Sequence, residues 1–295
     1  MHTGALAALV LLRLPSIYTD MGAENAIWAG RYTLWTAASL ALLVAFVAWR
    51  GLRPGVPEAA SQDEHFLVLM KKGIKAAKNP RVALAYGAAF VSRGDLVIVS
   101  SFMTLWLLQV GISEGLSPQD ASKQASGYLA MVQTFALLWA PVIGIIIDRM
   151  NRVAAIIIAI VLAGIGYINI GLMDNPMAAG GIIAAGLLGM GEISGVLASQ
   201  ALIGQEAPNR ERGSVFGTFG MFGAIGILIA LAVGGQLFDL WRPSAPFLMM
   251  GIANVVLLFL AIYVYVYHRE PSEEVLAAAR GDATPNPEGV AAGAV

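Results

Sequence analysis

Cysteine is absent from the 295-residue sequence, and this absence excludes disulfide bonds and thiol chemistry. Histidine is scarce as well. His2, His65 and His268 all lie outside the long apolar runs, so no histidine-based metal or cofactor site is expected inside those runs. Charged residues make up only 13% of the chain, against 58% hydrophobic residues. This balance is far from that of a soluble domain and predicts an all-α integral membrane protein.

The sequence also lacks the short motifs of common enzyme classes. It contains no P-loop and no G-x-S-x-G, and a net charge of −1 gives no indication of nucleic-acid binding. An intramembrane enzyme would need a close pair of catalytic groups, for which Asp95 and Glu192 are the only candidates. We therefore expect no enzymatic activity, no catalytic residues, no metal and no cofactor.

Apolar runs of membrane length follow one another along the chain. Trp28–Trp49 is a full span with tryptophan at both ends, where interfacial aromatic residues tend to lie. The shorter run Gly4–Leu14 is about half a span. Six further spans are expected at Val82–Val110, Ala125–Ile147, Val153–Met173, Met177–Ile203, Ser214–Phe238 and Phe247–Tyr267.

Between the spans, the polar stretch after Arg50 contains an amphipathic segment, Phe66–Lys78. On a helical wheel its four lysines fall within about 120°, and an apolar group falls opposite them. This pattern predicts a helix lying on the anionic cytoplasmic leaflet, the alternative being a solvated linker helix. The lysines are Lys71, Lys72, Lys75 and Lys78; the apolar group is Phe66, Leu69, Met70, Ile74 and Ala77.

The distribution of lysine and arginine predicts the orientation. Residues 50–81 contain seven of them, and the loops at 148–152 and 204–213 contain two each. The loops on the opposite side contain only Lys123 and Arg242. By the positive-inside rule the first group is cytoplasmic, which places the carboxy-terminus in the cytoplasm and the protein in the inner, cytoplasmic membrane.

The loop between the second and third of the six spans carries the pattern G-x-x-x-D-R-x-x-R, formed by Gly144, Asp148, Arg149 and Arg152. We expect Gly144 to admit a neighbouring helix, and Asp148 to accept hydrogen bonds from that helix's N-terminus. The pattern resembles the signature loop of the major facilitator superfamily of secondary transporters. Two departures are Asn151 in place of the usual glycine and Val153 in place of a basic residue.

A second segment adds to the resemblance. The cytoplasmic turn Pro208–Gly217, including Pro208, Arg212 and Gly213, is similar to the family's turn before its eleventh helix. The spacing Gly144-x-x-x-Asp148 recurs as Gly235-x-x-x-Asp239 on the opposite membrane face, which favours two inverted three-helix repeats. A glycine at every third position from Gly217 to Gly226 predicts close helix packing.

The resemblance implies a six-helix carboxy-terminal bundle preceded by one and a half helices, with the rest of the amino-terminal half missing. We accordingly divide the chain into four parts. Residues 1–50 are a remnant of the amino-terminal bundle, and 51–81 are a cytoplasmic central loop with the amphipathic helix. Residues 82–268 are the six-helix bundle, and 269–295 are a disordered cytoplasmic tail rich in alanine, glycine, proline and glutamate.

Ionisable residues inside a membrane span are candidates for function by default, and Arg93, Asp95 and Glu192 are the three here. Arg93 and Asp95 point about 200° apart on a helix and should not pair. Arg93 shares a polar stripe with Tyr86, Ser100 and Thr104, which predicts contact with a translocation cavity or substrate. The alternative is a structural bridge from Arg93 to Glu192.

Asp95 and Glu192 each admit two interpretations. Asp95 is a proton carrier, or it holds a neighbouring helix through serine or asparagine donors. Glu192 lies among Gly189, Gly191 and Gly195, and it binds a proton or cation or serves as a hydrogen-bonded structural group. Gln133 is a further candidate for the pathway, although such amides are more often interhelical hydrogen-bond donors.

We therefore expect a transporter that works by alternating access, with a small organic molecule as substrate and a proton, or another cation, as coupling ion. Its partners would be the lipid bilayer and the missing amino-terminal half-bundle. The loop at Asp148, Arg149 and Arg152 would act as a gate latch rather than as a simple turn. The alternative function is a non-transporting half-bundle that serves as a membrane partner or regulatory subunit.

Overall fold

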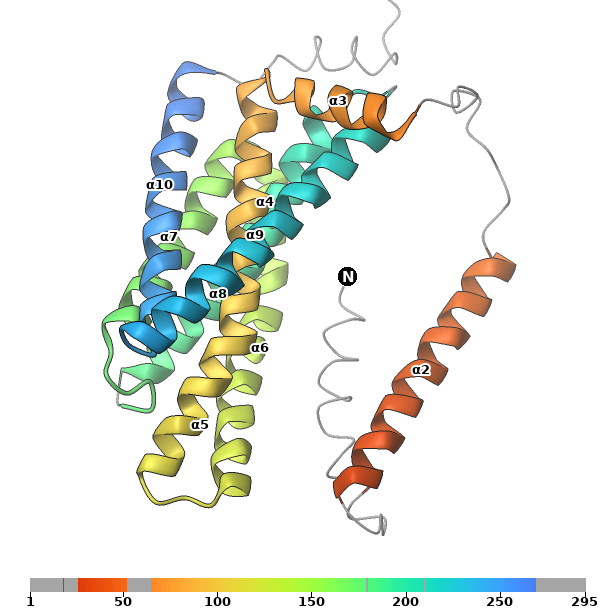
Figure 1. The fold of residues 1–295 in the computed structure, drawn as a ribbon. Coiled ribbons are helices and arrows are strands. Elements are labelled where there is room, and N and C mark those ends of the chain that lie inside the picture. Colours follow the sequence, from red (N-terminus) through yellow and green to blue (C-terminus); the bar gives the residue numbers. More distant parts are fainter. Residues whose placement is uncertain (1–17, 19–25, 52–64, 179, 210, 269–295) are drawn as a thin grey trace, which may run out of the picture. The chain divides into compact units, whose positions relative to one another are not determined.

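The computed structural model describes residues 18, 26–51, 65–178, 180–209 and 211–268, and within them all regular structure is helical (Figure 1). The predicted half-span at Gly4–Leu14 and the predicted tail at 269–295 lie outside these residues. Among the described residues, seven stretches are long and apolar enough to cross a membrane. The predicted all-α membrane protein is thus confirmed. The chain divides into two units, Met1–Asp63 and Glu64–Val295, which are described separately.

The first unit contains helix α2, Ala26–Gly51, which covers the predicted span Trp28–Trp49. Most of its apolar side chains are exposed, as a helix surrounded by lipid requires. Trp28, Tyr32 and Trp35 form an aromatic cluster near one end. Near the other end, the Arg50 guanidinium lies 5.9 Å from the centroid of the Phe46 ring. Aromatic and basic residues at both ends are typical of a helix anchored at two membrane interfaces.

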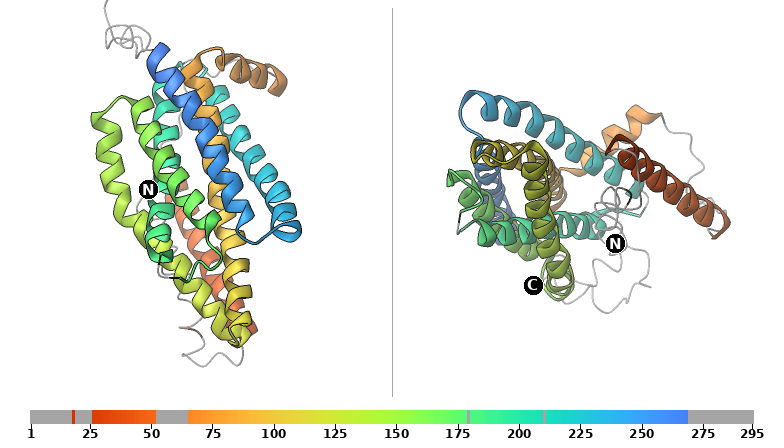
Figure 2. Two further views of the ribbon diagram at one scale, coloured as in Figure 1. Left: turned by 90° about the vertical axis from the view of Figure 1, so that its left-hand side faces the viewer. Right: turned by 90° about the horizontal axis from the view of Figure 1, so that it is seen from below.

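The second unit is a bundle of long helices with one short helix across its end (Figures 1 and 2). The short helix is α3, Phe66–Ala76. The first span is made of three consecutive pieces: α4 (Pro80–Ile98), the π-helix η2 (Val99–Met103) and α5 (Thr104–Ser113). The other spans are α6 (Pro118–Arg149), α7 (Arg152–Leu172), α8 (Gly181–Glu206), α9 (Arg212–Leu240) and α10 (Ala245–Tyr267).

All six predicted spans form helices, but two starting points were wrong. Helix α6 begins at Pro118, seven residues before the predicted Ala125, because the Ser117 hydroxyl caps it by accepting from the Asp120 N–H and Pro118 occupies the first turn. Helix α8 begins at Gly181 rather than Met177. There the Asn175 side chain accepts from the Met177 N–H and holds residues 175–177 in a turn.

Backbone contacts at glycines hold several helices very close together. A Cβ added at Gly226 of α9 would overlap the carbonyl oxygen of Phe90 on α4. One added at Gly189 of α8 would overlap the carbonyl oxygen of Val132 on α6. In contrast, a Cβ at Gly217 or Gly220 would meet no atom within 4 Å. The predicted close packing of the α9 glycines is therefore confirmed for its second half only.

The helix contacts repeat in a symmetric pattern. If the first three spans (α4–α5, α6, α7) are exchanged with the last three (α8, α9, α10), the α4–α9 contact maps onto α8–α6, and α4–α10 maps onto α8–α7. The α4–α8 and α7–α10 contacts map onto themselves. Each set contains an odd number of spans, so the second set starts from the opposite side of the membrane. This is the packing that two inverted three-helix repeats produce.

Helix α3 packs against α9 and is linked to α4. The Tyr86 hydroxyl of α4 donates to the Gly73 carbonyl at 2.9 Å, and the Tyr86 ring stacks on Phe222 of α9. Gly73 itself is buried against Thr218 of α9. The predicted apolar face is therefore divided: part of it packs on the bundle, whereas Ile74 remains exposed.

A buried ion pair joins two helices at the same end of the bundle. The Arg81 Nε of α4 lies 2.6 Å from Oε1 of Glu206 at the end of α8, and both side chains are about 95% buried. The Asn79 Nδ2 donates to the other carboxylate oxygen of Glu206 at 3.0 Å. A charge pair this well buried depends on both partners being present.

Candidate functional site

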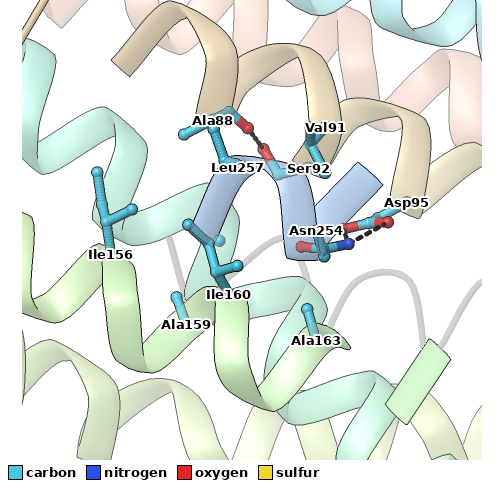
Figure 3. A pocket seen from close by; sticks show the side chains of 11 residues that line it. Ala88, Val91, Ser92, Asp95, Ile156, Ala159, Ile160, Ala163, Asn254 and Leu257 are labelled. Carbon is cyan, nitrogen blue, oxygen red and sulfur yellow. Dashed lines mark hydrogen bonds between the residues drawn. The ribbon is translucent and has the colours of Figure 1, made fainter. Parts of the chain in front are cut away.

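The interior of the bundle contains a small polar cluster where α4, α7, α8 and α10 meet. Its best-ordered contact joins Asp95 of α4 to Asn254 of α10, both 2% exposed. The Asn254 Nδ2 lies 3.1 Å from each carboxylate oxygen and also 3.0 Å from the Met250 carbonyl (Figure 3). The carboxylate thus holds α10 against α4, as expected for the asparagine-donor interpretation of Asp95.

Glu192 of α8 belongs to the same cluster but lacks a hydrogen-bond donor. It is 6% exposed, and its Oε2 has no partner in the described structure. The fully buried Tyr167 hydroxyl of α7 likewise has no partner among the described residues. Asp95 and Glu192 lie close enough for their charges to interact, and both interact electrostatically with Tyr167. Two carboxyl groups therefore share one apolar interior with few donors to solvate them.

A cavity of about 10 Å³ adjoins Asp95, and it is large enough for about one water molecule. Ser92 and Asn254 contribute the other polar side chains of its wall, and the Ser92 hydroxyl donates to the Ala88 carbonyl on its own helix (Figure 3). The remaining lining is small or aliphatic, from α4, α7, α8 and α10: Val91, Ile156, Ala159, Ile160, Ala163, Gly195 and Leu257. The cluster is therefore compact and nearly dry in this structure.

Arg93 points away from this cluster. Its side chain is half-buried, and a Cβ on Gly223 of α9 would lie 2.9 Å from the Arg93 Cγ, so the missing side chain at Gly223 makes room for the arginine stem. Among the described residues the guanidinium forms no ion pair, so the predicted bridge to Glu192 is not formed. The expectation that Arg93 and Asp95 point in different directions is confirmed.

The rest of the predicted polar stripe does not stay on one face. Tyr86 is buried and bonded to α3, whereas Ser100 is exposed and Thr104 is half-exposed. Both hydroxyls donate to carbonyls of their own helix, at Val97 and Ser100 respectively. A wheel of 100° per residue fails across Val99–Met103, because a π-helix turns less per residue than an α-helix. Gln133 is exposed on α6.

The charged loop between α6 and α7 is closed by contacts within itself. The Arg152 Nη1 donates to the Ile147 carbonyl at 2.7 Å and lies 3.2 Å from Asp148, whose side chain is 78% exposed. The expected helix-capping role of Asp148 falls instead to Asn151, which accepts from the Val153 N–H. Arg149 is exposed. A Cβ added at Gly144 would meet no atom within 4 Å, so in the described part of the chain no helix approaches this glycine.

The turn before α9 is also open. Pro208, Arg212 and Gly213 are all at least partly exposed, and the Arg212 guanidinium lies 5.7 Å from the centroid of the Phe216 ring. Among the described residues there is no group of three or more histidine, cysteine, aspartate or glutamate side chains arranged to hold a metal ion.

Sequence reasoning underestimated two members of the interior cluster. Asn254 was expected to form an interhelical hydrogen bond, but nothing in the sequence linked it to Asp95, 159 residues away. Tyr167 had no visible signal, because one tyrosine in an apolar helix is usually a packing residue. A polar residue in each of four apolar spans was the one clue, but their depths could not be compared without knowing where each helix begins.

Curated relatives match parts of this chain. The magnetosome protein MamH of Paramagnetospirillum magneticum is 30% identical over 178 residues, covering 60% of this chain and 41% of MamH. The magnetosome protein MamZ of the same organism is 30% identical over 219 residues, covering 73% of this chain and 33% of MamZ. The class H tetracycline resistance protein of Pasteurella multocida is 25% identical over 155 residues, covering 52% and 38%.

The chain thus spans about a third to two fifths of the length of these relatives. A family model described as Major Facilitator Superfamily matches residues 96–290, about two thirds of the chain, from the end of α4 through α10. Together with the membrane-length helices and their repeated packing, this match shows that the chain belongs to the major facilitator superfamily of membrane transporters.

Proposed function

We propose that this chain forms a bundle of a proton-coupled secondary transporter that moves a small organic solute. The observation that carries the proposal is the pair of buried carboxyl groups, Asp95 and Glu192, in one interior cluster. A carboxylate buried without donors is costly in an apolar interior, so such a group is seldom kept for packing alone. The name of the tetracycline resistance protein supports a small organic molecule as substrate.

The coupling step follows from the Asp95–Asn254 contact. When Asp95 is ionised, both of its oxygens accept from Asn254 and link α4 to α10. A proton on Asp95 removes the charge that strengthens these hydrogen bonds, so the link weakens. Protonation of the nearby Glu192 removes a repulsive charge and acts in the opposite direction. Proton binding can then bias two packings of the same helices.

The solute path lies on the other side of α4. Arg93 has no acidic partner among the described residues, and Ser100, Thr104 and Gln133 are at least partly exposed. We propose that these four residues line the path and that a second six-helix bundle completes it. The unoccupied space beside Gly144 on α6 and beside Gly217 and Gly220 on α9 would accommodate its helices.

We further propose that the loop of Asp148, Arg149 and Arg152 is the latch of one gate. Its internal pairing of Arg152 with Asp148 leaves Arg149 exposed and accessible to a partner on the second bundle. The cytoplasmic position of this loop and of the carboxy-terminus is part of the same proposal. A bundle that only binds another membrane protein would show the same open surface but no proton coupling, which the following experiment distinguishes.

The test measures proton binding and transport separately. Infrared difference spectra of the reconstituted protein, taken between acidic and alkaline buffer, should contain a protonated-carboxyl band that is reduced in Asp95→Asn and Glu192→Gln. The same variants should abolish gradient-driven movement of tetracycline, used as the trial solute, in cells that supply the second bundle. Asp120→Asn, which changes an exposed carboxylate at the start of α6, is the matched control and should leave both signals unchanged. Bands and transport unaffected by both interior substitutions would refute proton coupling through this site.

A further inference from the structure

Two contacts fix the rotation of α3 about its own axis. Gly73 is buried against Thr218 of α9, and its carbonyl accepts from the Tyr86 hydroxyl of α4. Met70 and Ala77, which lie on the same side of the helix as Gly73, are half-buried. The opposite parts of α3 are therefore held outward in a defined direction.

The outward surface combines two kinds of side chain. Leu67 is 68% exposed and Ile74 is 47% exposed, and their seven-residue spacing places them on one line along the helix. Lys71 and Lys78, also seven apart, form a parallel line about 40° away, with Lys75 beyond it. All three lysines are exposed. We call these five residues the α3 strip.

We propose that the α3 strip binds the headgroup region of a bilayer that contains anionic phospholipid. Exposed leucine and isoleucine side chains can enter the boundary between headgroups and acyl chains, while the lysine stems extend along it and their ammonium groups reach lipid phosphates. The strip lies at one end of a membrane-spanning bundle, beside the bilayer surface. Free phosphate would pair with the lysines but would leave Leu67 and Ile74 uncovered.

Lipid binding at this strip would be felt inside the bundle. Helix α3 is bonded to α4 through Tyr86 and packed on α9 through Gly73, so a force that holds α3 on the bilayer acts on the ends of both helices. The strip shares no residue with the interior cluster of Asp95 and Glu192, and the following test does not depend on the proposed transport.

The experiment uses the complete chain, and the absence of cysteine makes specific labelling simple. Leu67→Cys is labelled with an environment-sensitive fluorophore, and the protein is placed in nanodiscs of phosphatidylcholine alone or of equal parts phosphatidylcholine and phosphatidylglycerol. We expect a shift to shorter emission wavelength only in the anionic discs, reversed by high salt. Adding inorganic phosphate to the neutral discs should produce no shift.

Substitution of the lysines tests the charge requirement. Each lysine near an anionic surface contributes about a fivefold gain in affinity, so Lys71→Gln, Lys75→Gln and Lys78→Gln together should abolish the shift. Lys123→Gln changes an exposed lysine at the start of α6 and should retain it. An equal shift in neutral and anionic discs, or a shift that survives the triple substitution, would overturn the proposal.

Discussion

Alanine at Gly226 is expected to cause the largest loss of stability of any single methyl group added to this bundle. The new Cβ would overlap the Phe90 carbonyl oxygen of α4, and backbone atoms cannot move aside as a flexible side chain can. The two helices must separate along their contact. Overpacking of this kind costs about 1–3 kcal/mol and more where the obstacle is rigid, so we expect the upper end of this range or failure to fold.

Gly220→Ala provides a matched control for Gly226→Ala. It makes the same chemical change nearly two turns earlier in the same helix, where nothing described lies within 4 Å of the new Cβ. Both substitutions gain the same helix propensity, so the difference between them reports packing alone. Thermal unfolding in detergent, followed by size-exclusion chromatography, measures both. Equal melting temperatures would show that α4 and α9 are not in backbone contact.

Replacing Arg81 with methionine should be almost as damaging. The substitution leaves the buried Glu206 carboxylate without its cationic partner, and removing one partner of a buried ion pair costs about 3–5 kcal/mol. The double variant Arg81→Met and Glu206→Met removes both charges and should recover most of that loss, because a well-packed apolar pair replaces the buried ions with little net cost. The comparison separates the cost of an orphaned charge from the value of the pair.

Lys123→Met is the surface comparison for Arg81→Met. Lys123 and Asp120 approach at 3.9 Å with both side chains well exposed, and pairs of this type contribute about 0–1 kcal/mol. The same thermal assay should therefore show little change for Lys123→Met. A single Arg81 variant as mild as this control, or a double variant as unstable as the single one, would contradict the assignment of a buried, interdependent pair.

The membrane helices were predicted well from the sequence, because hydrocarbon requires long apolar stretches and charged turns reveal where they end. The family followed from Gly144, Asp148 and the arginines of one loop. The opposite orientations of Arg93 and Asp95 followed from helix geometry alone. These predictions depend on local sequence or on composition, which a single chain displays directly.

What could not be predicted depends on contacts between distant segments. Asn254 meets Asp95 only because α10 packs against α4 at a particular depth, and Tyr86 is buried only because α3 folds back over it. The π-helix at Val99–Met103 has no proline or glycine within it to reveal it. One irregular turn was enough to separate Thr104 from the face that the helical wheel assigned to it.

The π-helix also has a consequence for how the length of this span can vary. A turn closed by i to i+5 hydrogen bonds contains one more residue than the α-helical turn it replaces. Deleting any one residue between Val99 and Met103 would let the backbone close as a continuous α-helix, and everything after it would swing by about 100°. Trp106 and Leu107 would then turn out of the interior, so the surplus residue is what keeps the outer third of this span in register with the rest.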